Sequence, residues 1–191
     1  MTSNGSAPHV LFVCEGNICR SPYAMVSFSE SWAAAGHGPV TSSSAGTRAP
    51  AGAGAHDELG RFFEDPGSTS MLAAHRSRPL DADLVRIADV VITMERRQRT
   101  DVLALVPRAL RRTYMLHELA LVAAAVRESS TSPDGASLAD LTGRFRFAAR
   151  DARDVADPIK GSAGDFADMA HDIDRSLHQV VPLLASVLAG R

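Results

Sequence analysis

A short segment near the N-terminus brings together side chains that suit chemistry on a tetrahedral anion. In VLFVCEGNICRSPYAM, residues 10–25, Cys14 is followed after five residues by Arg20, and Cys19 is the only other cysteine of the chain. A cysteine thiolate is a strong nucleophile. The planar guanidinium of an arginine fits two oxygens of a phosphate-like group. The spacing therefore predicts a loop that holds an oxyanion above a nucleophilic sulfur.

The residues around the two ends of this loop favour an anion-binding turn. Gly16 relieves steric limits on the turn, and Asn17 is of a type that tolerates a left-handed backbone. The backbone N–H groups of such a turn can converge on one point, and a helix that begins directly after it adds its positive end. Positive surroundings favour the thiolate form of a cysteine. We therefore expect Cys14 to be a thiolate at neutral pH, with Ser21 donating a hydrogen bond to it.

These features indicate nucleophilic displacement at phosphorus through a phosphocysteine intermediate. The charge would be held by Arg20 and the backbone N–H groups, so no metal and no other cofactor are expected. The predicted phosphate-binding loop consists of Cys14, Glu15, Gly16, Asn17, Ile18, Cys19 and Arg20.

The leaving group needs an acid from a distant loop. The segment DVADPIKG offers Asp157, and Pro158 favours an extended backbone at the residue before it, which can aim the carboxyl group. Asp151 and Asp154 are competing carboxylates on the same loop. Asp157 is the predicted acid.

Composition narrows the class of protein. The chain has 191 residues, 45% hydrophobic content and a formal net charge of -2, which suit one α/β domain and do not suggest a nucleic-acid binder. The longest apolar run is too short to span a membrane, and no signal peptide is recognised. Two cysteines do not form a disulfide framework, so we expect a cytoplasmic protein in which the thiols stay reduced. A homodimer is one state that the sequence leaves open.

Apolar runs alternate with helical patterns along the chain. Strands are expected at 9–14, 40–46, 89–94 and 111–116, and helices between and after them, including one at 56–65 that ends at Pro66 and one at 138–150. This alternation predicts an α/β fold: a single domain with a four-stranded parallel sheet, helices on both faces and the phosphate-binding loop after strand 1. We expect residues 1–8 to be a disordered lead and residues 9–191 to form the domain, with an insertion around 128–150.

Several segments together resemble one enzyme family. FVCEGNICRSP resembles the phosphate-binding loop of the low-molecular-weight protein tyrosine phosphatases. SSAGT (43–47), HRSRPL (75–80), DVVITM (89–94) and DVADP (154–158) resemble further segments of that family. The resemblance covers most of residues 9–125 and 151–189. It implies a metal-independent phosphomonoester hydrolase, with a phosphorylated protein or small phosphate ester as substrate and inorganic phosphate as product.

The resemblance implies a role for each matching residue. Cys14 would be the nucleophile, Arg20 would bind phosphate and assist the transition state, and Asp157 would be general acid and then general base. Asn17 and Ser21 would organise the loop and the thiolate.

Two supporting residues have less specific signals. Cys19 would pair with Cys14 under oxidation and protect it from over-oxidation, or else only pack against the start of the helix. His75 is expected to brace the loop by hydrogen bonding rather than to act as a catalyst.

The sequence departs from the family where the substrate would lie. The family usually has an aromatic residue after Asp-Pro, where this chain has Ile159, and often another in the segment that here reads RAPAGAGAH (48–56). Those aromatics flank the ring of phosphotyrosine, so the natural substrate stays open. An arsenate reductase on the same scaffold is an alternative, although no cysteine follows Cys19 to relay oxidation. A non-catalytic phosphate-binding module is the other alternative.

Overall fold

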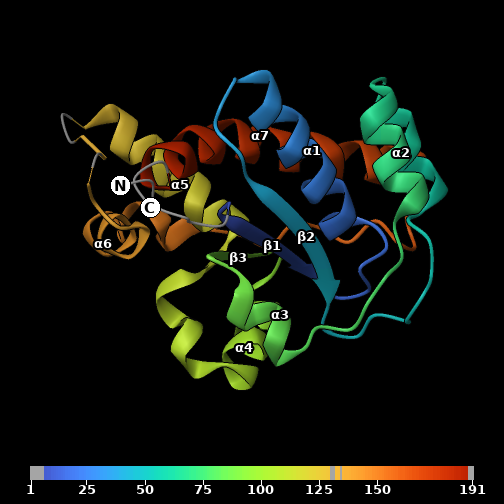
Figure 1. The fold of residues 1–191 in the computed structure, drawn as a ribbon, viewed down its shortest axis with the longest axis horizontal. Helices are drawn as coiled ribbons and strands as arrows, with labels where there is room; N and C mark the ends of the chain where they lie inside the picture. The colour runs from blue at the N-terminus through green and yellow to red at the C-terminus, as the bar shows by residue number, and fades with distance from the viewer. Residues whose placement is uncertain (1–6, 130–131, 134, 189–191) are drawn as a thin grey trace.

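The computed structural model describes residues 7–129, 132–133 and 135–188. Most of the expected lead over residues 1–8 lies outside these ranges. A single parallel sheet forms the centre, with strand order β2-β1-β3-β4 (Figure 1). Its strands are β1 (His9–Cys14), β2 (Thr41–Gly46), β3 (Val90–Thr93) and β4 (Thr113–Met115). The predicted fold class is confirmed, and every strand lies within two residues of its expected position.

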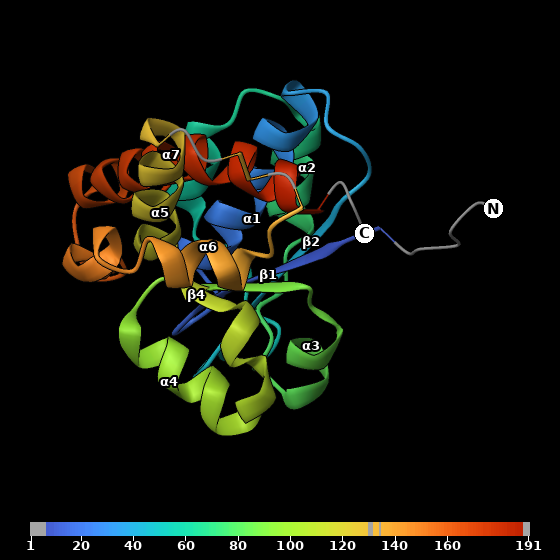
Figure 2. The same ribbon diagram turned by 90° about the vertical axis from the view of Figure 1, so that its left-hand side faces the viewer.

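Helices cover both faces of the sheet, as Figure 2 shows most clearly. The helices are α1 (Arg20–Ala34), α2 (Pro66–Ala74), α3 (Ala82–Ile87), α4 (Arg96–Leu105), α5 (Leu116–Glu128), α6 (Leu138–Arg144) and α7 (Ala163–Leu188). Three shorter 3-10 segments are η1 (Asp57–Phe62), η2 (Pro107–Arg112) and η3 (Ala148–Asp151). None of the helices in the described ranges is both long and apolar enough to cross a membrane.

Strand β1 is buried on both faces because alternate side chains serve two different cores. Val10 and Phe12 point into a core shared with α1, α5 and α7. Leu11 and Val13 point into a second core formed with α3 and α4. A strand covered on both faces is expected to read as a continuous apolar run rather than an alternating one. This central strand therefore gives a rigid base to the loop that follows Cys14.

Two helix predictions need correction. The helix expected at 56–65 is only the 3-10 segment η1, and Pro66 begins α2 instead of ending the preceding helix. Asp65 caps α2 by accepting a hydrogen bond from the backbone N–H of Ser68 at 2.9 Å. Proline is favoured at the first helical position because its missing N–H has no partner there anyway. The helix expected at 138–150 is also divided, into α6 and η3.

The parallel strands place their carboxyl ends at one edge of the sheet, where ligands bind in folds of this kind. The loop between β1 and α1 lies at this edge. The segment that connects η3 to α7, residues 152–162, reaches the same edge, where the N–H of Val155 donates to the carbonyl of Met94 at 2.8 Å. The fold thus brings Cys14 and Asp157 together across more than a hundred residues of sequence.

Candidate active site

The sulfur of Cys14 lies at the floor of a cavity of about 440 Å³ at the end of β1. The residue is 2% exposed. Its Sγ lies 2.9 Å from Ser21 Oγ and accepts a hydrogen bond from the backbone N–H of Asn17 at 3.2 Å. With the sulfur as a thiolate, both neighbours donate to it. These contacts are the ones that would stabilise a nucleophilic sulfur.

Asn17 is the residue that fixes the turn of the loop. It adopts φ of 53°, the only positive φ of a non-glycine residue among those described. Its Nδ2 donates to Ser21 Oγ at 3.0 Å and to Ser44 Oγ at 2.9 Å, while its Oδ1 accepts from the N–H of Arg78 at 3.0 Å. Both polar atoms of the buried amide therefore have partners, and the amide connects the loop to β2 and to the segment after α2.

His75 supports the same turn through a hydrogen bond to its backbone. Its Nε2 lies 2.8 Å from the carbonyl oxygen of Asn17, which can only accept, so Nε2 carries a proton. Burial is the main cause that lowers the pKa of His75 below its ordinary value, and the hydrogen bond to Asn17 opposes this shift. The structure thus places His75 against the loop backbone, outside the cavity lining.

Gly46 is a site residue to which sequence reasoning gave no role. A Cβ atom at this position would lie 2.5 Å from the carbonyl oxygen of Glu15 and 2.9 Å from the backbone nitrogen of Asn17. The end of β2 therefore approaches the loop too closely for any side chain. Directly after it, the N–H groups of Thr47 and Arg48 donate to the carbonyls of Cys14 and Glu15 at 3.0 and 2.9 Å. The glycine within SSAGT was the sequence signal from which a role for Gly46 could have been inferred.

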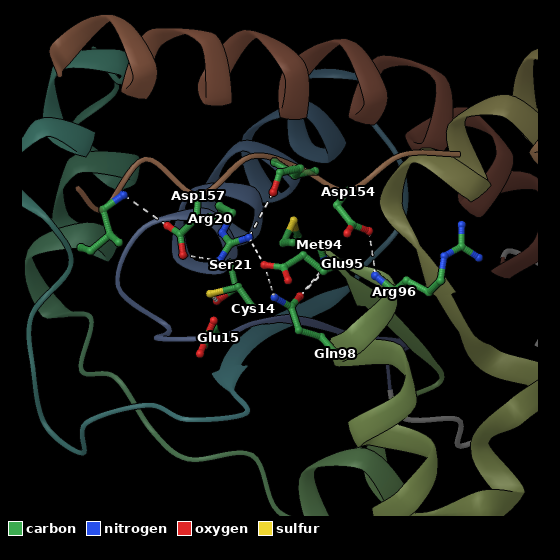
Figure 3. Close-up of polar contacts among 12 residues, drawn as sticks. Cys14, Glu15, Arg20, Ser21, Met94, Glu95, Arg96, Gln98, Asp154 and Asp157 are labelled. Atoms are coloured by element: carbon green, nitrogen blue, oxygen red, sulfur yellow. Dashed lines mark hydrogen bonds and ion pairs between the residues drawn. The ribbon is translucent and has the colours of Figure 1, made fainter. Parts of the chain in front are cut away.

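Arg20 is 1% exposed, and its guanidinium is held by three acceptors at the edge of the cavity (Figure 3). Nη1 forms an ion pair with Glu95 and donates to the carbonyl of Val155 at 3.0 Å. Nη2 pairs with Asp157 Oδ2 at 2.5 Å. A guanidinium anchored in this way presents its remaining donors in a fixed direction, which suits an oxyanion.

Glu95 is the second residue that sequence reasoning missed. Besides pairing with Arg20, its Oε1 accepts from Nε2 of Gln98 at 2.8 Å, so the carboxylate is itself oriented (Figure 3). An acidic residue that follows a buried parallel strand lies at the ligand-binding edge of the sheet. The position of Glu95 directly after DVVITM was the sequence signal that could have identified it.

Only one of the three competing carboxylates lines the cavity. Asp157 does so, and its Oδ1 accepts from the N–H of Ile159 at 3.2 Å. Asp154 instead accepts from the backbone N–H of Arg96 at 2.9 Å, at the start of α4 (Figure 3). Asp151 is exposed beside Arg150. The side chain of Asp157 is 36% exposed, which leaves it accessible to a leaving group.

Cys19 also lines the cavity but differs chemically from a nucleophile. Burial raises the pKa of its thiol to about 12, with the negative charges of Asp157 and Cys14 acting in the same direction and Arg20 opposing them. Cys19 is therefore a neutral thiol at physiological pH. Both cysteines are free thiols in this structure.

The mouth of the cavity is lined by Glu15, Gly16, Ile18, Ile159 and Lys160. Aromatic side chains are absent from the described lining, and Ile159 is 44% exposed. Glu15 pairs with Arg48 at 3.2 Å across the surface, where solvent weakens the attraction. No cluster of three or more His, Cys, Asp or Glu side chains that could hold a metal occurs within the described part of the chain.

Residues 9–128 match the family model of the low molecular weight phosphotyrosine protein phosphatases. That range contains Cys14, Arg20 and Glu95 and ends before Asp157. The low molecular weight protein-tyrosine-phosphatase Wzb of Salmonella typhi is 36% identical over 95 residues, which are 46% of this chain and 54% of Wzb. The chain therefore spans about half the length of the curated relatives it matches.

Solved structures share the fold over nearly the whole chain. The tyrosine phosphatase AmsI of Erwinia amylovora superposes with a TM-score of 0.67 at 20% identity, covering 95% of this chain and 96% of AmsI. The YwlE arginine phosphatase of Geobacillus stearothermophilus superposes with a TM-score of 0.65 at 21% identity, covering 93% of this chain and 92% of YwlE. At these identities the likeness concerns the architecture alone.

Proposed function

Because the chain belongs to the low molecular weight phosphotyrosine protein phosphatase family, we propose that it is a cysteine-dependent phosphatase that hydrolyses phosphate monoesters, with phosphotyrosine in proteins as its substrate. One observation carries the proposal: the thiol of Cys14, the guanidinium of Arg20 and the carboxyl of Asp157 meet at a single cavity of about 440 Å³. That volume is within the range of small-ligand sites.

In the first half of the proposed reaction, the Cys14 thiolate attacks phosphorus and an S–P bond forms. The bond between phosphorus and the leaving oxygen breaks, and the carboxylic acid of Asp157 donates a proton to that oxygen. The non-bridging oxygens lie against Arg20 and the N–H groups of the loop, which stabilise the transition-state charge. Inorganic phosphate has not yet formed, because the phosphoryl group remains on the sulfur.

In the second half, water attacks the phosphocysteine. The carboxylate of Asp157 accepts a proton from this water, the S–P bond breaks and inorganic phosphate leaves. The sulfur departs as a thiolate, which is supported by its contacts with Ser21 Oγ at 2.9 Å and the N–H of Asn17 at 3.2 Å. No metal is required in either step, because the charges are held by side chains and backbone donors of the chain itself.

The same cavity argues against a relay of thiols such as an arsenate reductase uses. The sequence contains two cysteines, and the second, Cys19, has a pKa raised to about 12. A thiol that stays protonated attacks a modified Cys14 slowly, because the thiolate is the reactive form. A non-catalytic binding module is disfavoured by the acid that faces the nucleophile across the cavity.

Purified protein tests the proposal through inorganic phosphate released from phosphotyrosine peptides and from para-nitrophenyl phosphate, beside arsenate with added thiols. We expect turnover of both phosphate esters. Consumption of arsenate without phosphate release would favour the reductase instead.

We further propose a cytoplasmic location, which is supported by the two free thiols at the cavity, since cysteines stay reduced there.

The role of Asp157 is tested by how strongly the loss of kcat in a variant depends on the leaving group. Asp157→Asn is expected to lower kcat by about 10²- to 10³-fold on esters with poor leaving groups such as phenol, because these need a proton. The loss on para-nitrophenyl phosphate should be below about tenfold, since that group leaves as an anion. Steady-state kinetics across a series of aryl phosphates measures the difference.

Asp151→Asn is the matched control for this series, because Asp151 directly precedes the same segment, is exposed and does not line the cavity. It should leave kcat unchanged for every ester. Equal losses on good and poor leaving groups in Asp157→Asn would contradict an acid role.

Ile159→Tyr tests the aliphatic wall of the cavity. Ile159 stands where an aromatic ring would flank the substrate, and it is exposed. A tyrosine there is expected to lower KM for a phosphotyrosine peptide by about 2- to 10-fold, because paired aromatic rings gain about 0.5–1.5 kcal/mol. Ile87→Tyr, on the exposed end of α3, is the control. An unchanged KM in Ile159→Tyr would place the substrate ring elsewhere.

A further inference from the structure

The segment that carries Asp157, residues 152–162, is called here the acid loop. Near the cavity it is fixed to the sheet edge at two neighbouring residues. Val155 donates its N–H to the carbonyl of Met94 at 2.8 Å, and its own carbonyl accepts from Arg20. The carboxylate of Asp154 accepts from the N–H of Arg96 (Figure 3). These ties hold the middle of the acid loop.

The stem of the acid loop is held by a different group of residues, away from the cavity. His117, in the first turn of α5, has its Nδ1 2.7 Å from the carbonyl oxygen of Arg153. The guanidinium of Arg153 forms an ion pair with Asp172 on α7. Asp172 Oδ2 also lies 3.0 Å from His117 Nε2. We call His117, Arg153 and Asp172 the stem clamp.

The chemistry of the stem clamp shows which contact matters most. The carbonyl of Arg153 can only accept, so Nδ1 of His117 carries the proton in that hydrogen bond. Nε2 of His117 lies 3.0 Å from Asp172 Oδ2 without an aligned hydrogen bond. His117 therefore holds the backbone of Arg153 directly, while Asp172 forms an ion pair with the side chain of Arg153.

Two members of the stem clamp, His117 and Asp172, are largely buried, Arg153 is exposed, and there is space beside all three. The side chains of His117 and Asp172 are 8% and 13% exposed. They line a hollow of about 340 Å³ between α5 and α7, together with Arg127, Arg153 and Arg175. Removing the imidazole would therefore admit water to the carbonyl of Arg153, and the stem would lose a fixed donor without a collapse of the core.

From these contacts we propose that His117 is a positioning residue for proton transfer: it fixes the acid loop at Arg153 and so sets where Asp157 meets the leaving oxygen. The inference rests on the proposed phosphatase function. Arg153 is four residues before Asp157, and Val155 between them is anchored to Met94. With the tie at Arg153 lost, the segment is free to turn about its anchor at Val155, and a turn there displaces the carboxyl group of Asp157 two residues further on. A displacement of about 1 Å at a reacting group costs up to about 100-fold in rate.

The kinetic test compares His117→Ala with His117→Asn. His117→Ala is expected to lower kcat about tenfold on phenyl phosphate and less than about twofold on para-nitrophenyl phosphate, with inhibition by inorganic phosphate unchanged. In His117→Asn the amide Nδ2 stands near the place of Nδ1 and can donate to Arg153, so most of the loss should be restored. Equal losses on both esters, or no restoration by asparagine, would overturn the proposal.

A second measurement does not depend on activity. Amide hydrogen exchange in a peptide covering residues 152–162 should become faster in His117→Ala and return toward wild type in His117→Asn. His178→Ala, an exposed histidine on α7, is the control and should change neither exchange nor kinetics. Unchanged exchange in His117→Ala would overturn the positioning role. A wild-type protein without phosphatase activity would instead overturn the proposed function and leave this exchange test in force.

Discussion

Cys14→Ser is expected to lower kcat by at least about 10⁴-fold on every phosphate ester, because removing a covalent nucleophile removes the catalytic group on which the other residues depend. A serine hydroxyl stays protonated at neutral pH and is a much weaker nucleophile than the thiolate that Ser21 Oγ and the N–H of Asn17 would stabilise. Phosphate release from para-nitrophenyl phosphate and a phosphotyrosine peptide measures the loss.

The variant should still bind inorganic phosphate, because Arg20 and the loop N–H groups are unchanged. Rapid acid quenching of the wild-type reaction, followed by mass mapping, should show a phosphoryl group on the peptide that contains Cys14. Cys19→Ser is the matched control: it removes the other thiol of the same cavity and should keep most of the activity. Phosphate release that survives Cys14→Ser would disprove the phosphocysteine mechanism.

Arg20→Lys is expected to lower kcat/KM by about 10²- to 10³-fold, the range found when a donor to transition-state charge is lost. The guanidinium of Arg20 serves Glu95, the carbonyl of Val155 and Asp157 at the same time. An ammonium is a single point donor and does not reproduce the planar fork. Glu95 would also lose the guanidinium and keep only Gln98 as a partner, so the loop would be less well fixed.

The effect of inorganic phosphate on Tm separates loss of function from loss of fold in Arg20→Lys. Inorganic phosphate should raise Tm of the wild type, because it binds only the folded state, and should have little effect on the variant. Arg48→Lys is the control, since Arg48 is exposed and pairs only with Glu15 at the surface. Phosphate protection equal to that of the wild type in Arg20→Lys would contradict the assigned role.

The phosphate-binding loop was predictable because its chemistry is local. Cys14, Asn17, Arg20 and Ser21 are close in sequence, so their spacing already describes one turn between a strand and a helix. The four parallel strands were predictable for a similar reason, because each is a short apolar run between polar turns. Asp157 was found through the proline that follows it.

The missed residues act through contacts that cross the chain. Glu95 meets Arg20 across 75 positions, and His117 meets Arg153 across 36. Neither contact leaves a periodic pattern, because the pairing depends on how strands and helices pack. Gly46 is required because a Cβ atom at this position would lie 2.5 Å from the carbonyl oxygen of Glu15, which belongs to another segment of the chain. Pro66 was misread because proline both ends and begins helices, and the cap at Asp65 decides between them.

The ion pair between Arg20 and Asp157 bears on how turnover ends. Nη1 of Arg20 is engaged by Glu95 and Val155, so the donors that remain for an oxyanion are Nε and Nη2, and Nη2 also pairs with Asp157. A carboxylate tethered to the same chain acts as a competitor at high effective concentration. In the proposed reaction Asp157 holds a proton after the water attack, and once it loses this proton its carboxylate can return to the guanidinium. Asp157 and inorganic phosphate would then compete for the same donor, which favours release of the product.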